Sequence, residues 1–403
     1  MTRLVIVGGG HAAAQLAASL AEKQFPGSIV LVSDEPEIPY HRPPLSKTLI
    51  KDPEAPLPEL RGASFYEQAG ITLKLGTRAV AIDRAGKRLR LSSSAGQEDL
   101  AYDHLVLATG ACVRELPQAP VGTPGVHYLR TYAQARALRD ALPGAQRVVV
   151  LGGGFIGLEL AATARHLGKE VTVFEAMPRL LTRSVSPEIS SFLLETHRGA
   201  GVDIRLGSTV DGLEMAQDRA VGVVSGGVVV PADIIIAGIG ATPNVDLARE
   251  AGLTCDNGIV VDATLATGDP AISAIGDCTS FPHPAWPQPL RLESVQNAND
   301  QARTLAARLC GDPQPYTAVP WFWSDQGEAR LQITGLWRPG YESVVRPAAR
   351  GKGFSVLHFE GDALRAIESV NSPVDQMTAR KLMQAGLSPA KGTAADPAVP
   401  LKA

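Results

Sequence analysis

The feature that most constrains the fold is a glycine-rich turn that follows an apolar strand near the start of the sequence. The turn has the pattern G-x-G-x-x-A, formed by Gly8, Gly10 and Ala13. The first glycine permits a tight turn, the second lets the backbone approach a pyrophosphate, and the small third residue lets the helix pack closely on the strand. A helical stretch and a second strand, residues 28–33, then end in the acid Asp34. This order predicts a dinucleotide-binding unit.

The same unit occurs a second time. An apolar strand, residues 147–151, leads into the full G-x-G-x-x-G pattern of Gly152, Gly154 and Gly157. A helical stretch follows, and the next strand ends in Glu175. At the start of each helix, unpaired backbone N–H groups and the positive end of the helix dipole favour phosphate. Two such units predict two bound dinucleotides, or one unit that has lost its ligand.

The acid in the second unit predicts which nicotinamide dinucleotide is used. Glu175 is expected to accept hydrogen bonds from the hydroxyls of the adenosine ribose. Its negative charge would repel a 2′-phosphate, so NADH is favoured over NADPH. Arg179 and Arg183 act against this preference, because either side chain could reach a phosphate.

Length and composition limit the class of protein. The chain has 403 residues, of which 45% are apolar and 20% charged, and this composition is typical of a soluble globular protein with roughly two to four domains. A formal net charge of -3 argues against nucleic acid as the main partner. No apolar run approaches the roughly 18 residues of a membrane span. The first apolar run is too short for a secretory signal, so we expect a cytoplasmic protein.

The last quarter of the chain has a different pattern. After an aromatic cluster at 321–323, apolar and polar residues alternate in several short segments, as in antiparallel strands. The final stretch, 388–403, is rich in Ala and Pro and is expected to be extended or loosely ordered. The expected elements are strands at 330–335, 342–346, 354–359 and 363–370 and a helix at 374–385.

Four further motifs carry a resemblance to a known family. They are Y-H-R-P-P-L-S-K at 40–47, L-A-T-G at 107–110, A-I-G-D at 274–277 and W-F-W-S-D-Q at 321–326. Together they closely resemble the signature of the FAD-dependent ferredoxin reductases of Rieske-type dioxygenase and bacterial P450 systems. The resemblance covers essentially the whole chain in the right order. That family also includes rubredoxin reductases and resembles the apoptosis-inducing factor.

The resemblance implies an α/β fold of the glutathione-reductase type, with two Rossmann-type domains and a C-terminal α+β domain. It places a discontinuous FAD-binding domain at 1–110 and 242–320, an NAD-binding domain at 111–241 and a reductase domain at 321–403. FAD is then expected on the first glycine turn and NADH on the second.

The resemblance also implies roles for single residues. Asp34, with Ala12, is expected to hold the pyrophosphate and adenosine ribose of FAD, and Asp277 is expected to bind its ribityl or pyrophosphate portion, while Val80 and Arg130 lie on the adenine side. Val295 and Gln296 are expected to open a helix whose dipole stabilises the negative charge of reduced flavin. The full set of predicted cofactor-binding positions is Gly8, Gly10, Ala12, Ala13, Asp34, Arg42, Lys47, Val80, Thr109, Gly110, Arg130, Gly152, Gly154, Ile156, Gly157, Glu159, Glu175, Arg183, Gly240, Asp277, Val295, Gln296 and Trp321.

Three of these positions are predicted to be catalytic. Lys47 lies in the segment expected along the flavin, and Glu159 lies two residues after Gly157, in the first turn of the helix. We expect Lys47 and Glu159 to form an ion pair near flavin N5, with Glu159 positioning the nicotinamide carboxamide. The alternative is that Glu159 only favours a helix N-terminus and Lys47 only touches FAD phosphate or solvent. Trp321 is expected to cover the flavin or to fill the core.

The acceptor of the electrons is predicted to be a separate protein. Related disulfide reductases carry a redox cysteine pair beside the flavin, but residues 43–47 contain no cysteine and no C-x-x-C occurs in the chain. No cysteine-rich cluster motif predicts an iron–sulfur centre. The resemblance points to a small [2Fe–2S] ferredoxin that feeds an oxygenase, with the chain a monomer or weak homodimer. The alternatives are a rubredoxin reductase and a non-enzymatic flavoprotein like the apoptosis-inducing factor.

The cysteine pattern makes a first prediction. Replacement of Cys112, Cys255, Cys278 and Cys310 by Ser or Ala should leave the turnover from NADH to an artificial acceptor largely intact, because no thiol takes part. Turnover and bound FAD are measured on the same preparations. A loss of flavin reoxidation with FAD still bound would show that a thiol step exists.

Overall fold

The computed structural model describes residues 2–403, which divide into two compact units. The first unit contains residues 2–42, 57–112 and 242–318, and the second contains 43–56, 113–241 and 319–403. Residues 43–56 therefore belong to the second unit, although the segments on either side of them belong to the first. The assignment of one nucleotide to each domain stays a prediction.

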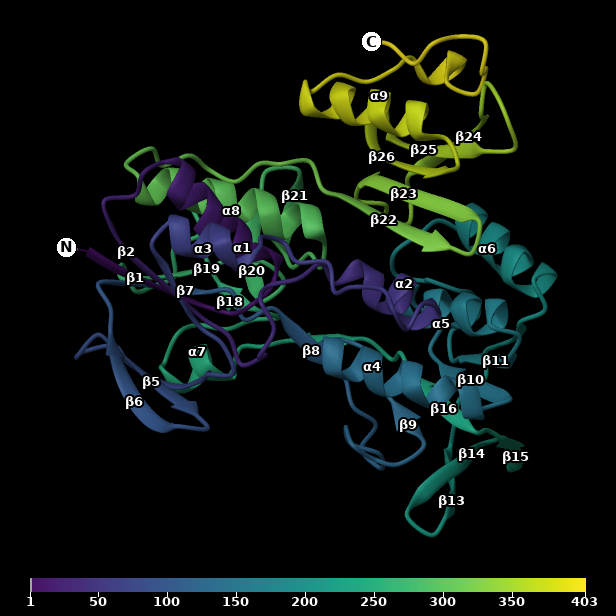
Figure 1. The fold of residues 1–403 in the computed structure, drawn as a ribbon. Coiled ribbons are helices and arrows are strands. Elements are labelled where there is room, and N and C mark those ends of the chain that lie inside the picture. Colours follow the sequence, from purple (N-terminus) through teal and green to yellow (C-terminus); the bar gives the residue numbers. More distant parts are fainter. Residues whose placement is uncertain (1) are drawn as a thin grey trace. The chain divides into compact units, whose positions relative to one another are not determined.

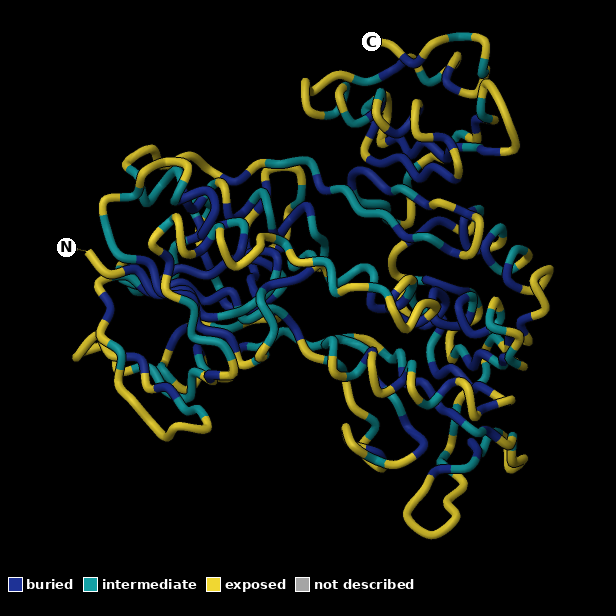
Figure 2. Tube along the Cα trace, viewed as in Figure 1, coloured by how far each residue is buried: buried dark blue, intermediate teal, exposed yellow. Residues whose placement is uncertain are grey.

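The first unit is built on a parallel sheet in the order β19-β7-β1-β2-β3. This is the strand order typical of a dinucleotide-binding half. Its central strands are buried on both faces, as the unbroken apolar runs predict, and they appear dark blue in Figure 2. Helices α1 (His11–Glu22) and α8 (Val295–Leu309) pack against each other beside the sheet (Figure 1). The strands are β1 (Thr2–Val7), β2 (Gly27–Val32), β3 (Ile71–Lys74), β7 (His104–Leu107) and β19 (Ile272–Ala274).

Two smaller sheets and two short helices complete the first unit. A three-stranded antiparallel sheet consists of β4 (Arg78–Asp83), β5 (Arg88–Ser93) and β6 (Gly96–Ala101). A second sheet consists of β18 (Ile259–Val260), β20 (Thr279–His283) and β21 (Trp286–Leu290), and the helices are α3 (Ala63–Gln68) and α7 (Asp246–Glu250). Strands β8 (Ala111–Val113) and β17 (Ala241–Pro243) pair where the chain passes between the units.

The second unit repeats the parallel arrangement, in the order β12-β11-β10-β16-β9. Its core includes Val149, Phe174 and Ile235 from three neighbouring strands. The strands are β9 (Val126–His127), β10 (Arg147–Leu151), β11 (Glu170–Glu175), β12 (Asp203–Leu206) and β16 (Ile234–Ala237), with an antiparallel sheet of β13 (Gly212–Ala216), β14 (Arg219–Ser225) and β15 (Val228–Pro231). The helices are η1 (Pro43–Ser46), α2 (Thr48–Lys51), α4 (Tyr132–Ala141), η2 (Leu142–Gly144), α5 (Phe155–His166) and α6 (Pro187–Gly199).

The C-terminal part of the second unit is an antiparallel sheet covered by one helix. Its order is β22-β23-β26-β25-β24. Each strand predicted from the alternating pattern is present within one residue of its expected bounds, and so is the helix, which confirms the α+β prediction. The elements are β22 (Trp321–Gln326), β23 (Ala329–Gly335), β24 (Glu342–Pro347), β25 (Phe354–Glu360), β26 (Ala363–Val370), α9 (Pro373–Gln384) and η3 (Lys391–Thr393).

The last stretch, expected to be extended or loosely ordered, contains only the short helix η3 but is fixed in place by a buried arginine, so it is not loosely ordered. The guanidinium of Arg346, only 3% exposed, donates to the carbonyl oxygens of Ala394, Asp396 and Val399 at 3.1, 2.6 and 3.0 Å. Its Nε donates to Asp375 on α9 at 3.1 Å. A buried guanidinium needs this many acceptors, and the tail supplies them through its backbone, which side-chain composition does not reveal.

None of the helices within residues 2–403 is long and apolar enough to cross a membrane.

Candidate functional site

The first glycine turn joins β1 to α1. Gly8 adopts a φ of +131°, and its N–H donates to the carbonyl of Val32 on β2 at 2.8 Å. A Cβ atom on Gly8 would lie 2.1 Å from the carbonyl oxygen of Ala108, so no larger residue fits. Gly10 is the N-cap of α1, and among residues 2–403 no side chain caps this helix end. The first backbone N–H groups of α1 can therefore bind a ligand.

The second glycine turn has the same geometry. Gly152 adopts a φ of +100°, and a Cβ atom there would lie 2.4 Å from the carbonyl oxygen of Gly238. A Cβ atom on Gly157 would lie 2.4 Å from the carbonyl oxygen of Gly152, which explains the third glycine of the motif. Gly154 is the N-cap of α5, and no side chain in the described part of the chain caps it.

Three other helices have the side-chain cap that α1 and α5 lack. Thr131, Ser186 and Ser294 each accept a hydrogen bond from a backbone N–H in the first turn of α4, α6 and α8. Such caps use the donors that a phosphate would otherwise bind. Two uncapped helix ends, each behind a turn that tolerates only glycine, therefore fit the pyrophosphates of two dinucleotides.

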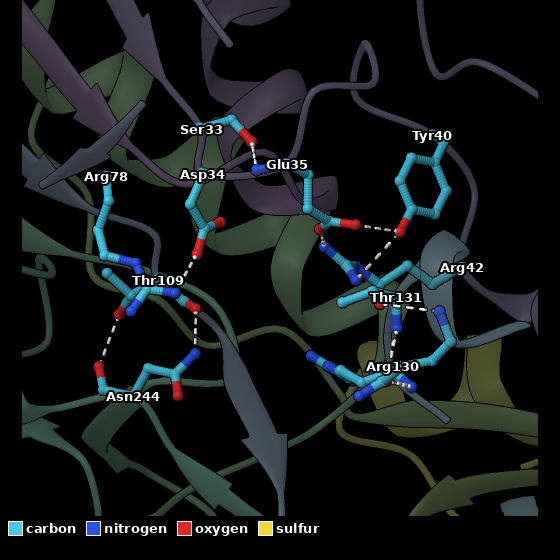
Figure 3. Close-up of polar contacts among 11 residues, drawn as sticks. Ser33, Asp34, Glu35, Tyr40, Arg42, Arg78, Thr109, Arg130, Thr131 and Asn244 are labelled. Atoms are coloured by element: carbon cyan, nitrogen blue, oxygen red, sulfur yellow. Dashed lines mark hydrogen bonds and ion pairs between the residues drawn. The ribbon is translucent and has the colours of Figure 1, made fainter. Parts of the chain in front are cut away.

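The acids after β2 have different environments. Asp34, the predicted ribose ligand, is exposed and lies 3.3 Å from Arg78 (Figure 3). The next residue, Glu35, is half-buried and accepts from Arg42 at 2.6 Å and from the hydroxyl of Tyr40 at 2.5 Å. This three-residue cluster fixes Arg42 in the first unit. Glu35 was not among the predicted site residues, and in the sequence only its position beside Asp34 points to it.

Thr109 and Asp277 lie at the same sheet edge as the first glycine turn. They follow β7 and β19, and parallel strands present their carboxyl ends along one edge. Thr109 is fixed by Asn244, whose carbonyl accepts from the Thr109 hydroxyl at 2.7 Å and whose amide donates to the Thr109 carbonyl at 2.8 Å (Figure 3). A Cβ atom on Gly276 would lie 3.0 Å from the Cβ of Ala12 on α1.

The acid at the end of β11 is part of the second glycine turn. Glu175 accepts from the backbone N–H of Gly153 at 2.6 Å and from that of Met177 at 2.7 Å. Arg179 is engaged elsewhere: it donates to the carbonyls of Thr182 and Val185, both at 2.8 Å, and lies over the ring of Trp337. Arg183 of the same loop is exposed.

The predicted ion pair between Lys47 and Glu159 is present in the second unit. Lys47 Nζ lies 3.0 Å from Glu159 Oε1 and 3.3 Å from Asp325 Oδ2. Glu159 is only 5% exposed. Helix α5 begins at Phe155, so Glu159 lies in its second turn and not in the first. The reading of Glu159 as a residue that only favours a helix N-terminus therefore does not fit.

Two serines complete the environment of the Glu159 carboxylate. The hydroxyl of Ser46 donates to Oε2 at 2.5 Å, and that of Ser324 donates to Oε1 at 2.6 Å. Thr163, one turn further along α5, donates to the carbonyl of Ser46 at 2.9 Å and fixes that segment. Neither serine was among the predicted site residues, although they stand beside Lys47 and Asp325 in the motifs at 40–47 and 321–326.

Trp321 belongs to an aromatic cluster at the start of β22. Its ring stacks on that of Trp323 with centroids 5.4 Å apart, and the guanidinium of Arg380 lies over it at 4.9 Å. Phe322 points toward α5, where its ring centroid lies 4.6 Å from that of Phe155.

The remaining predicted positions are distributed over both units. Ala12 and Ala13 are buried in α1, Val80 lies in β4, and Val295 and Gln296 open α8 as expected.

In the second unit, Arg130 precedes α4 and donates its backbone N–H to Gln134 at 2.7 Å. Ile156 is an exposed apolar residue at the start of α5, and Gly240 follows β16. Lys47 and Arg130, both expected to contact FAD, belong to the second unit.

Comparison with known families accounts for nearly all of the chain. Residues 2–302 match the family model described as pyridine nucleotide-disulphide oxidoreductase. Residues 321–403 match the model described as reductase C-terminal. The boundary between the two matches falls just before β22.

Individual relatives match over nearly their full length. The chain is 45% identical to rhodocoxin reductase of Rhodococcus erythropolis, over 99% of this chain and 93% of that protein. It is 42% identical to the anthranilate 1,2-dioxygenase system ferredoxin–NAD(+) reductase component of Burkholderia cepacia, over 99% and 98%. The crystal structure of the ferredoxin reductase for the CYP199A2 system from Rhodopseudomonas palustris has a TM-score of 0.94 at 44% identity, covering 100% of this chain and 99% of that one. The chain therefore belongs to the pyridine nucleotide-disulphide oxidoreductase family and is an oxidoreductase with FAD and a nicotinamide dinucleotide as cofactors.

Proposed function

We propose that this chain is an NADH:ferredoxin reductase that passes electrons through a small [2Fe–2S] ferredoxin to an oxygenase, either a Rieske dioxygenase or a P450. The proposal rests above all on residues 43–47. This segment contains no cysteine, and its last residue, Lys47, forms an ion pair with Glu159. The relatives named above are reductases of such systems. We place the protein in the cytoplasm, as a monomer or weak homodimer.

FAD, when bound, supplies the chemistry that accepts a hydride from a nicotinamide and releases electrons one at a time. In the first unit, the uncapped start of α1 receives its pyrophosphate. Asp34 and Asp277 accept hydrogen bonds from its hydroxyls, and Arg42, fixed by Glu35, adds positive charge.

In the second unit, the uncapped start of α5 receives the pyrophosphate of NADH. Glu159 orients the nicotinamide by accepting a hydrogen bond from its carboxamide N–H₂ group. Lys47 pairs with the Glu159 carboxylate and places a positive charge beside the reacting ring. Trp321, whose ring stacks on that of Trp323 and lies 4.9 Å from the guanidinium of Arg380, would cover the flavin.

The electrons must leave the protein. The cysteines of the described chain are all unpaired, and Cys278 is fully buried, where desolvation raises its pKa and opposes thiolate formation. A thiol relay of the disulfide-reductase kind is therefore disfavoured, and a one-electron carrier is the acceptor that matches the chemistry.

NADH is preferred over NADPH. The Glu175 carboxylate is fixed by two backbone N–H groups at the second glycine turn, where it accepts from ribose hydroxyls and repels a 2′-phosphate. Arg179 cannot offset this repulsion, because two backbone carbonyls and the ring of Trp337 already hold it. Arg183 of the same loop is exposed and is the arginine that could still contact a 2′-phosphate.

Rubredoxin reduction is the nearest alternative function, and the same flavin chemistry supports it. A non-enzymatic flavoprotein like the apoptosis-inducing factor is a second alternative. The Lys47–Glu159 ion pair, with the Glu159 carboxylate buried and held by two serine hydroxyls, favours an enzyme over the latter, because a binding protein has no need to orient a nicotinamide.

The proposed function is tested by measuring NADH-driven reduction of cytochrome c with and without an added carrier. A [2Fe–2S] ferredoxin should accelerate the reaction at least about tenfold over the protein alone, since electron transfer to a matched partner lowers the barrier. Rubredoxin should give little acceleration. Faster reduction with rubredoxin would establish the alternative function, and no acceleration by either carrier would contradict the reductase assignment.

The nucleotide preference is tested through Glu175. In the unmodified protein, kcat/KM with ferricyanide as acceptor should be at least about 100-fold higher for NADH than for NADPH, a difference of roughly 2.7 kcal/mol. Glu175→Ala should narrow this ratio by weakening NADH binding and removing the repulsion of the 2′-phosphate. The control is Glu170→Ala, which replaces an exposed glutamate at the other end of β11 and should not change the ratio of kcat/KM for NADH to that for NADPH. Equal kcat/KM values for the two nucleotides in the unmodified protein would defeat the assignment.

A further inference from the structure

A chain of buried hydrogen bonds leads from α6 through β22 to Glu159. Within the second unit, the amide Nε2 of Gln326 donates to Ser324 Oγ at 2.8 Å, and the Ser324 hydroxyl donates to Glu159 Oε1 at 2.6 Å. On the other side, the ring Nε2 of His197 lies 3.0 Å from Gln326 Oε1. The exposed fractions of these four residues are all 5% or less.

The direction of each bond follows from the groups involved. Gln326 Nε2 also lies 3.3 Å from the carbonyl oxygen of Phe155, which can only accept. If the Gln326 amide were reversed, its oxygen would lie against the carbonyl oxygen of Phe155, and two acceptors would face each other. The amide oxygen Oε1 therefore faces His197. Because Oε1 can only accept, His197 must carry its proton on Nε2. Burial lowers the pKa of His197, against the opposing effect of its bond to Gln326, so the ring is neutral at pH 7. The chain of donors therefore runs one way and ends at the carboxylate.

The Glu159 carboxylate has one acceptor position left. A carboxylate accepts about four hydrogen bonds, two at each oxygen. Ser324 donates to Oε1, which Lys47 Nζ also approaches as an ion pair at 3.0 Å, and Ser46 donates to Oε2. Within residues 2–403, these are the groups that bind this carboxylate, and the fourth position suits an amide N–H of a ligand.

We propose that Gln326 and His197 are positioning residues of the nicotinamide site. They fix the Ser324 hydroxyl and thereby the rotation of the Glu159 carboxylate, so that its remaining acceptor position receives the carboxamide. This inference rests on the role proposed above for Glu159. It makes the C-terminal strand β22 a functional part of nucleotide recognition, although Gln326 and His197 themselves touch no nucleotide.

The test compares the binding of NAD⁺ and ADP-ribose to the FAD-containing protein by isothermal titration calorimetry. ADP-ribose lacks the nicotinamide and so does not use Glu159. Ser324→Ala and Gln326→Met should each lower the affinity for NAD⁺ about tenfold, the effect of losing one hydrogen bond that orients a charged group, and leave ADP-ribose binding unchanged. Ser324→Thr keeps the hydroxyl and should restore NAD⁺ binding.

A matched control is Ser355→Ala, which removes an equally buried hydroxyl from β25 of the same sheet and should change the affinity for neither ligand. Equal losses for NAD⁺ and ADP-ribose in Ser324→Ala and Gln326→Met, or no loss in either, would overturn the positioning role. The variant Glu159→Gln distinguishes failure of the positioning role from failure of the role proposed for Glu159 itself. If Glu159→Gln lowers only NAD⁺ affinity while the other two variants do not, the positioning role alone is wrong; if Glu159→Gln changes nothing, both are wrong.

Discussion

A carboxylate that is almost completely removed from water determines how the second unit is assembled. Glu159 is only 5% exposed, and an ionised group in such a place is tolerated only if partners compensate the lost hydration, since removal of one partner from a buried pair costs about 3–5 kcal/mol. Two of those partners, Ser46 and Lys47, precede the second glycine turn in the sequence. The third, Ser324, lies on β22, which follows all strands of the two parallel sheets in the sequence. The positions of η1, α5 and β22 are therefore joined through this one carboxylate.

A second buried carboxylate, that of Glu368, joins the C-terminal sheet to helix α6 of the second unit. Glu368 on β26 has no exposed surface, accepts from the backbone N–H of Ser186 at 3.0 Å and lies 2.9 Å from the ring Nε2 of His358. Ser186 is the N-cap of α6, so the contact places a negative charge at the positive end of that helix. The C-terminal sheet is thus connected to the nucleotide-binding part through polar contacts that tolerate little displacement.

The parts of this structure that the sequence predicts are those set by local rules. The glycine turns, the buried strands and the C-terminal meander follow from residue spacing and alternation, and the family motifs indicate the ion pair. Hydrogen-bond partners that lie far apart in the sequence could not be predicted. Nothing near Arg346 indicates that it binds the tail, and nothing in the motif around Ser324 indicates that Gln326 meets His197, 129 residues earlier. The same holds for residues 43–56, which pack in the second unit although the segments on either side of them belong to the first.

The central claim is that Lys47 and Glu159 act as one unit in hydride transfer. The most direct test is a double-mutant cycle in which NADH reduces the FAD-containing protein anaerobically in a stopped-flow instrument. Lys47→Met and Glu159→Gln should each retain FAD and slow the reduction about tenfold or more, and the double variant should be scarcely slower than either single variant, because both changes remove the same interaction. Unchanged rates in both single variants, or effects that multiply in the double variant, would contradict this account.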